Sequence, residues 1–117
     1  MANGYYVLDG REARQASDAE WLLQSYARRK RTAGDHDPWR IGKRETIGDA
    51  EVSTVFLGLD YSYGDGPPLI FETMIFGGDY GQHQWRYSTY DEAEAGHAAV
   101  VESLRNGTKP PGYEDED

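Results

Sequence analysis

The stretch EVSTVFLGLDYSYGDGPPLIFETMIF, residues 51–76, decides the fold. Its two ends, 51–59 and 69–76, are rich in β-branched and aromatic residues and therefore predict two strongly apolar strands. Between them, DYSYGDGPP at 60–68 is a Gly/Pro loop that suits neither a helix nor a strand. The centre of the predicted fold is therefore a pair of neighbouring strands joined by a long loop.

Further strands are predicted on both sides of this pair. Before it, strands are expected at 5–8 and 11–16, joined by a DG hairpin turn, and at 39–47. After it, residues 82–88 are expected to return as a strand beyond the loop GGDYG at 77–81. The short connections favour antiparallel neighbours.

Two capping-box patterns, SDAE at 17–20 and TYDE at 89–92, predict the starts of two helices. The first ends in RRKR at 28–31, where cations suit the carbonyl end of the helix dipole. The second is expected from about Tyr90 to Leu104. The predicted apolar stripes consist of Ala19, Leu22, Leu23 and Tyr26 in the first helix, and of Ala93, His97, Val100, Val101 and Leu104 in the second.

The fold class is therefore predicted to be α+β, with the order ββαββββα. We expect an antiparallel sheet meander with two helices packed on one face. A chain of 117 residues suits one domain, which we place at 1–105. The remainder, NGTKPPGYEDED at 106–117, is Pro-rich and then acidic and is predicted to be a disordered tail.

The net charge of −9 is unevenly distributed. Residues 1–48 hold nine Lys and Arg against seven Asp and Glu, whereas residues 49–117 hold three against fourteen. The acidic half should repel nucleic acid and membrane surfaces. We therefore expect a protein partner with a basic surface and no membrane association.

The sequence also excludes some kinds of chemistry. It contains no Cys, which excludes disulfides, thiolate zinc sites and a Cys nucleophile. The MANG start lacks the features of a signal peptide and no apolar run reaches transmembrane length, so a cytoplasmic location is expected. The histidines are His36, His83 and His97. We expect no metal or other cofactor, because the adjacent loop residues 35–37 cannot all wrap one ion and metal ligands usually come from separate elements. His97 lies on an apolar helix face and is predicted to be a packed, hydrogen-bonded core residue.

Residues 47–101 carry a set of motifs that resembles a family of small bacteriophage and prophage proteins. The motifs are IG with VSTVFLGLD at 47–60, GPPLIFETMIFGG at 66–78, and RYSTYDEAEAGH at 86–97, and YYVLDG at 5–10 also fits. The resemblance implies a phage-type accessory gene product, acting in the cytoplasm of the host cell, and implies no particular chemistry. Residues 11–46 depart from the family pattern.

Glu72 in LIFETMIF is the most conspicuous carboxylate of the chain. By alternation it shares a strand face with Ile70, Met74 and Phe76, where an unpaired charge would be costly. A five-residue loop at 77–81 would place Glu72 opposite Arg86, so we predict a structural cross-strand ion pair. The alternative is that Glu72 acts as a general acid or base in a small enzyme centred on these two residues.

Aromatic and acidic residues in and around two loops form the predicted partner-binding surface. Loop aromatics often anchor protein partners, and surrounding carboxylates suit a basic one. The loop 60–68 is expected at the same end of the sheet as the start of the second helix. The predicted partner-binding residues are Asp60, Tyr61, Tyr63, Asp65, Tyr80, Asp91 and Glu92.

The leading functional hypothesis is a non-enzymatic binding protein that inhibits a host defence system, as an anti-CRISPR protein does, or another host nucleic-acid-binding protein. It would occupy a basic surface by charge mimicry. The alternative is a nucleic-acid-binding regulator that uses the basic segment 28–44. The cations of that segment are Arg28, Arg29, Lys30, Arg31, Arg40, Lys43 and Arg44.

Overall fold

The computed structural model describes residues 4–31, 37–60, 62 and 66–112. The element order is ββαββββα, as predicted, with two antiparallel sheets. The strands are β1 (Tyr6–Asp9), β2 (Glu12–Gln15), β3 (Glu45–Ile47), β4 (Ala50–Phe56), β5 (Phe71–Phe76) and β6 (Gln84–Tyr87), and the helices are α1 (Asp18–Arg31) and α2 (Tyr90–Asn106). The predicted α+β class is therefore confirmed.

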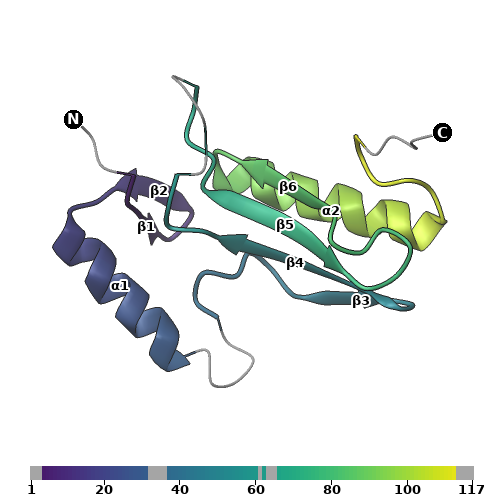
Figure 1. Ribbon diagram of the computed structural model, residues 1–117, viewed down its shortest axis with the longest axis horizontal. Helices are drawn as coiled ribbons and strands as arrows, with labels where there is room; N and C mark the ends of the chain where they lie inside the picture. The colour runs from purple at the N-terminus through teal and green to yellow at the C-terminus, as the bar shows by residue number, and fades with distance from the viewer. Residues whose placement is uncertain (1–3, 32–36, 61, 63–65, 113–117) are drawn as a thin grey trace.

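β3 to β6 form a four-stranded antiparallel meander in chain order, and α2 covers one face of it (Figure 1). Phe56 and Phe71 lie at the centre of one core cluster and their rings are 5.2 Å apart. A second cluster joins Val52 and Ile75 to α2 residues near its C-terminal end. The predicted strand at 39–47 is a strand only at 45–47, although 39–41 also hydrogen-bonds to β4.

β1 and β2 form a separate hairpin, and α1 lies against β1 (Figure 1). The expectation that both helices pack on one face of one sheet is therefore wrong for α1. The inward face of α1 is made by Trp21, which stacks on Tyr5 at 4.8 Å, and by Gln24, whose amide hydrogen-bonds to both backbone groups of Leu8. Gln24 thus bonds α1 to the backbone of the hairpin, beside the aromatic contact between Trp21 and Tyr5.

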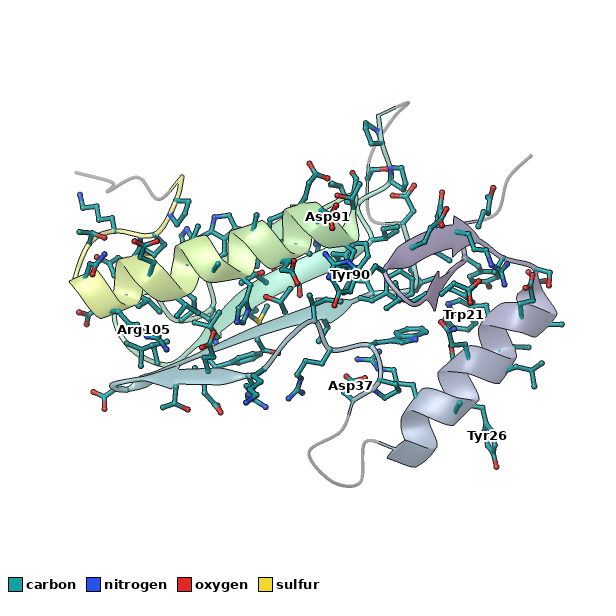
Figure 2. The ribbon with its side chains drawn as sticks, turned by 180° about the vertical axis from the view of Figure 1, so that it is seen from behind. Trp21, Tyr26, Asp37, Tyr90, Asp91 and Arg105 are labelled. Carbon is teal, nitrogen blue, oxygen red and sulfur yellow. The ribbon has the colours of Figure 1, made fainter. Side chains whose placement is uncertain are left out.

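The predicted apolar stripe of α1 faces solvent instead. Leu22, Leu23 and Tyr26 are 60%, 72% and 59% exposed. Figure 2 shows Tyr26 pointing away from the rest of the molecule, whereas Trp21 lies toward the hairpin. The stripe of α2, in contrast, is buried against the sheet as predicted.

The predicted boundary at residue 105 also needs correction. α2 continues to Asn106 and ends at Gly107, which adopts a left-handed conformation and donates its N–H to the carbonyl of Leu104. Beyond it, Pro110 is buried and the carbonyl of Pro111 accepts a 2.8 Å hydrogen bond from Trp85 Nε1. Residues 107–112 therefore belong to the folded unit, while the acidic end at 113–117 lies outside the described residues.

Candidate functional site

A series of hydrogen-bonded polar side chains, buried at its centre and half-buried at its two ends, links α2 to the inner face of the sheet. Glu45 Oε2 lies 2.8 Å from His97 Nε2, and His97 Nδ1 lies 2.7 Å from Thr54 Oγ1. Thr54 Oγ1 is in turn 2.6 Å from Thr73 Oγ1, which accepts a hydrogen bond from the Tyr87 hydroxyl at 3.1 Å. Burial raises the pKa of Tyr87, and the bond to Thr73 offsets part of that effect. The predicted role of His97 as a hydrogen-bonded core residue is confirmed.

Within this hydrogen-bonded series, the carboxylate of Glu45, the imidazole of His97 and the hydroxyl of Thr54 follow one another in the order of a catalytic triad. However, Thr54 is fully enclosed, and its hydroxyl already contacts both His97 and Thr73. No substrate atom can approach that oxygen without displacing the core around it. These hydrogen-bonded side chains therefore act as a connection between α2, β3, β4 and β5. Sequence reasoning missed it because the pairing of Thr54 with Thr73 depends on strand register. The threonines at central positions of two apolar strands were the available signal.

The predicted ion pair between Glu72 and Arg86 is present. The two residues are register partners on β5 and β6, and Arg86 Nε donates to Glu72 Oε2 at 3.0 Å. The pair lies on the sheet face opposite α2, because Phe71, Thr73 and Ile75 are the β5 residues that are buried beneath the helix. Glu72 therefore lies outside the core beneath α2, with its side chain 15% exposed. A catalytic role for the pair stays a hypothesis.

Asp91 and Glu92 lie in the first turn of α2, and Asp60 follows β4 at the same end of the sheet. Asp60 Oδ1 accepts the backbone N–H groups of Ser62 and Leu69; burial opposes its ionisation, but these bonds leave its pKa below the ordinary value. Glu92 closes the capping box of α2. Asp91 is 83% exposed, and Tyr61, Tyr63 and Asp65 lie outside the described residues.

This acidic end is partly neutralised by the hairpin. Arg11 forms ion pairs with Asp91 at 2.7 Å and Glu94 at 3.0 Å, and its guanidinium lies 4.2 Å from the centre of the Tyr90 ring. The hydrogen bonds from Arg11 lower the pKa of Glu94. A basic partner at this end would have to compete with a cation that the chain itself supplies.

Tyr80 lies at the other end of the sheet, in the β5–β6 turn. It lines a hollow of about 260 Å³ that reaches from the β3–β4 turn to the C-terminal end of α2. Asp49 and Asp79, both exposed, stand at its rim, and their carboxylates have no hydrogen bond or ion pair within the described part of the chain. Ile47, Ala50 and Leu104 supply apolar lining, with Gly78, Gly107 and Thr108 completing it.

Comparison with known proteins adds no family and no relative. Family models, curated proteins and solved structures give no match to this chain. Within the described residues, no helix is long and apolar enough to cross a membrane, and no group of three or more metal-ligating side chains converges. The candidate sites therefore rest on geometry and charge alone.

Some cations of the basic segment 28–44 form ion pairs within the protein. Arg28 forms a bidentate pair with Asp37, at 2.9 and 2.7 Å, and its guanidinium lies 4.7 Å from the centre of the Trp39 ring. Arg44 pairs with Glu51 at 3.1 Å. The side chains of residues 29–31 lie outside the described residues. At least two of the cations proposed for nucleic-acid binding thus have structural partners.

Proposed function

We propose that the protein is a non-enzymatic binding protein whose partner is a protein with a basic surface. The supporting observation is the hollow beside Tyr80, where Ile47 and Leu104 lie near two exposed carboxylates, Asp49 and Asp79, that have no partner within the described residues. The narrower hypothesis, an inhibitor of a host defence system or of another nucleic-acid-binding host protein, adds the phage-type resemblance to this charge argument.

The lining of the hollow suits the side chain of a lysine or arginine. Such a side chain has an apolar stem, which can lie on Ile47 and Leu104, and a cationic end, which can reach the rim. There it would pair with the carboxylates of Asp49 and Asp79 in charge-assisted hydrogen bonds.

The hollow is small for a ligand pocket. Pockets for drug-sized ligands enclose about 300–1,000 Å³, whereas this one measures about 260 Å³ and opens between two β-turns. A cavity of this size takes one inserted side chain, and the affinity must then come from the surface around it. The −11 balance of residues 49–117 supplies long-range attraction for a cationic surface.

The carboxylates at the two ends of the sheet differ in whether they already pair with a cation of the protein. At the α2 start, Asp91 and Glu94 already share Arg11. At the Tyr80 end, binding a cation breaks no existing ion pair of Asp49 or Asp79 within the described residues. This difference is why the proposal places the basic partner at the Tyr80 end.

The test is a pull-down from a bacterial lysate with the immobilised full chain, followed by elution with salt. The site variant Asp49→Asn/Asp79→Asn removes two negative charges without changing side-chain shape. The control, Glu12→Gln/Glu102→Gln, removes two exposed carboxylates elsewhere. We expect one basic protein in near-stoichiometric amount, lost with the site variant and retained with the control. Equal loss with both variants would mean that only net charge matters, and recovery of no basic protein would refute the proposal.

A further inference from the structure

We infer that the protein binds a small zwitterion with an apolar body, a free amino acid or a short peptide, in a hollow between α2 and the segment that leads into β3. The hollow measures about 580 Å³, which lies within the usual size range of small-molecule pockets. It shares no lining residue with the hollow beside Tyr80. The inference therefore does not depend on the basic partner.

α2 forms one wall of this hollow through two rows of side chains. Residues four apart lie one above the other on a helix. One row contains His97, Val101 and Arg105, and the other contains Ala98 and Glu102. The segment that leads into β3 forms the facing wall. The hollow thus combines apolar surface from an alanine and a valine with ionisable groups on both walls.

Several ionisable groups of the lining are already paired within the protein. Glu45 Oε2 lies 2.8 Å from His97 Nε2, and Glu45 Oε1 accepts a hydrogen bond from Arg105 at 3.3 Å. Glu94 forms an ion pair with Arg11 at 3.0 Å. Both oxygens of Glu45 and the carboxylate of Glu94 therefore have partners without any ligand.

Two charged groups of the lining have no partner, and they have opposite signs. Lys43 and Glu102 are exposed, and neither forms a hydrogen bond or an ion pair within the described part of the chain. Lys43 belongs to the wall before β3 and Glu102 to the wall of α2. Arg105 adds spare donors beside them, because its bond to Glu45 is longer than the usual charge-assisted distance of about 2.7–2.9 Å.

This arrangement fits a ligand that carries both charges itself. Its carboxylate would accept hydrogen bonds from Lys43 and from the spare N–H groups of Arg105, and its ammonium group would donate to Glu102. Its apolar body would lie on Ala98 and Val101. A ligand with a single charge would leave either Lys43 or Glu102 unpaired.

The charge of the whole chain also favours a zwitterion over a simple anion. The net charge of −9 repels anions at long range. A zwitterion carries no net charge and is not repelled. A simple cation would be attracted, but it would face the unpaired ammonium group of Lys43 in the same hollow.

NMR titration of the full chain with L-phenylalanine tests the site. We expect a dissociation constant of about 1 mM, as for a ligand of about twelve heavy atoms, with shifts of the backbone amide signals of Gly42, Ala98 and Val101. Phenylpropionate lacks the ammonium group and phenethylamine lacks the carboxylate, so both should bind more weakly. Glycyl-L-phenylalanine separates the two sources of a zwitterion, since tighter binding than that of phenylalanine would assign the site to a short peptide.

Matched variants test each charge separately. Lys43→Gln should weaken binding of L-phenylalanine and phenylpropionate about 2- to 5-fold, the range expected for one exposed ion pair, and should not weaken phenethylamine. Glu102→Gln should weaken L-phenylalanine and phenethylamine by a similar factor, and should not weaken phenylpropionate. The control Arg44→Gln removes the same charge one residue after Lys43, where the side chain pairs with Glu51 and does not line the hollow.

Each outcome decides the inference. If L-phenylalanine at tens of millimolar shifted no signal of the lining residues, the inference would be overturned, even if the same chain still captured a basic protein through Asp49 and Asp79. Equal affinities for L-phenylalanine, phenylpropionate and phenethylamine would show that only the apolar surface binds, which refutes the zwitterion. Equal weakening by Arg44→Gln and Lys43→Gln would refute a direct contact with Lys43.

Discussion

α1 and α2 carry the same sequence signals of a helix but lie in very different surroundings. Each has a capping box, acidic residues in its first turn, basic residues in its last turn and an apolar stripe. α2 buries Ala93, Val100 and Val101 against the sheet, whereas α1 leaves Leu22 and Leu23 in solvent. An apolar stripe therefore shows where a helix needs cover and does not show whether its own chain provides that cover.

The packing surfaces explain the difference, because each helix follows a four-residue strand after two residues. α2 follows β6 after two residues and reaches an inner sheet face of apolar side chains and threonines. α1 meets a two-stranded hairpin, which gives it a smaller packing surface than the four-stranded sheet gives α2. A hollow of about 380 Å³ remains between α1, the hairpin and Trp39. We expect α1 to be the first element to open when the fold is destabilised.

The largest effect is expected where α2 and the sheet share their core. Phe56 is fully buried, and its ring lies 4.9 Å from that of Trp39 and 5.2 Å from that of Phe71. Phe56→Ala should lower the free energy of unfolding by about 3–5 kcal/mol, because it removes an aromatic ring and leaves a cavity. Urea titration measures the change. A loss below about 1 kcal/mol would mean that this core is far looser than its burial indicates.

The second effect concerns the polar connection beneath α2. Thr54→Val keeps the side-chain shape but removes the hydroxyl that lies between His97 and Thr73. Both partners then lose a hydrogen bond inside the core, which should cost about 1–3 kcal/mol. In a double-mutant cycle, Thr73→Val should cost less in the Thr54→Val background than it does alone. It then removes a hydroxyl that has already lost its hydrogen bond to Thr54. Additive losses would mean that the two hydroxyls do not interact.

These residues also mark the limit of what the sequence could predict. The buried strands, both helix starts, the core position of His97 and the pairing of Glu72 with Arg86 followed from alternation, capping boxes and loop length. The place of Tyr80 at the opposite end of the sheet from Asp91 also follows once the meander is accepted. The exposure of α1 did not follow, since it depends on Gln24 meeting the backbone of Leu8, a contact between residues 16 positions apart.

A smaller effect, dependent on pH, is expected at the attachment of α1. Burial opposes ionisation of Asp37, but the hydrogen bonds from Arg28 and from the Trp39 N–H outweigh it and hold its pKa below the ordinary value of 3.8. Asp37→Asn should destabilise the protein by about 1–3 kcal/mol at neutral pH, because it removes a charge-assisted pair.

The direction of the pH effect follows from the lowered pKa of Asp37. Its stabilising contribution is complete above the pKa of the unfolded chain and is lost as pH falls through the folded value. The gap between wild type and Asp37→Asn should therefore close below about pH 3.8. Hydrogen exchange should show the loss first in α1. A gap that persists unchanged in acid would contradict the ion pair with Arg28.

The smallest effect is expected on the exposed stripe, and it tests the comparison most directly. Leu23 is 72% exposed and Val101 is 4% exposed. Leu23→Ser should change the free energy of unfolding by at most about 0.5 kcal/mol, whereas Val101→Ser should cost several times more because it leaves a cavity and a buried hydroxyl. Urea titrations of both variants measure the difference. If Leu23→Ser cost as much as Val101→Ser, α1 would pack its stripe within its own chain, and the contrast between the two helices would not hold.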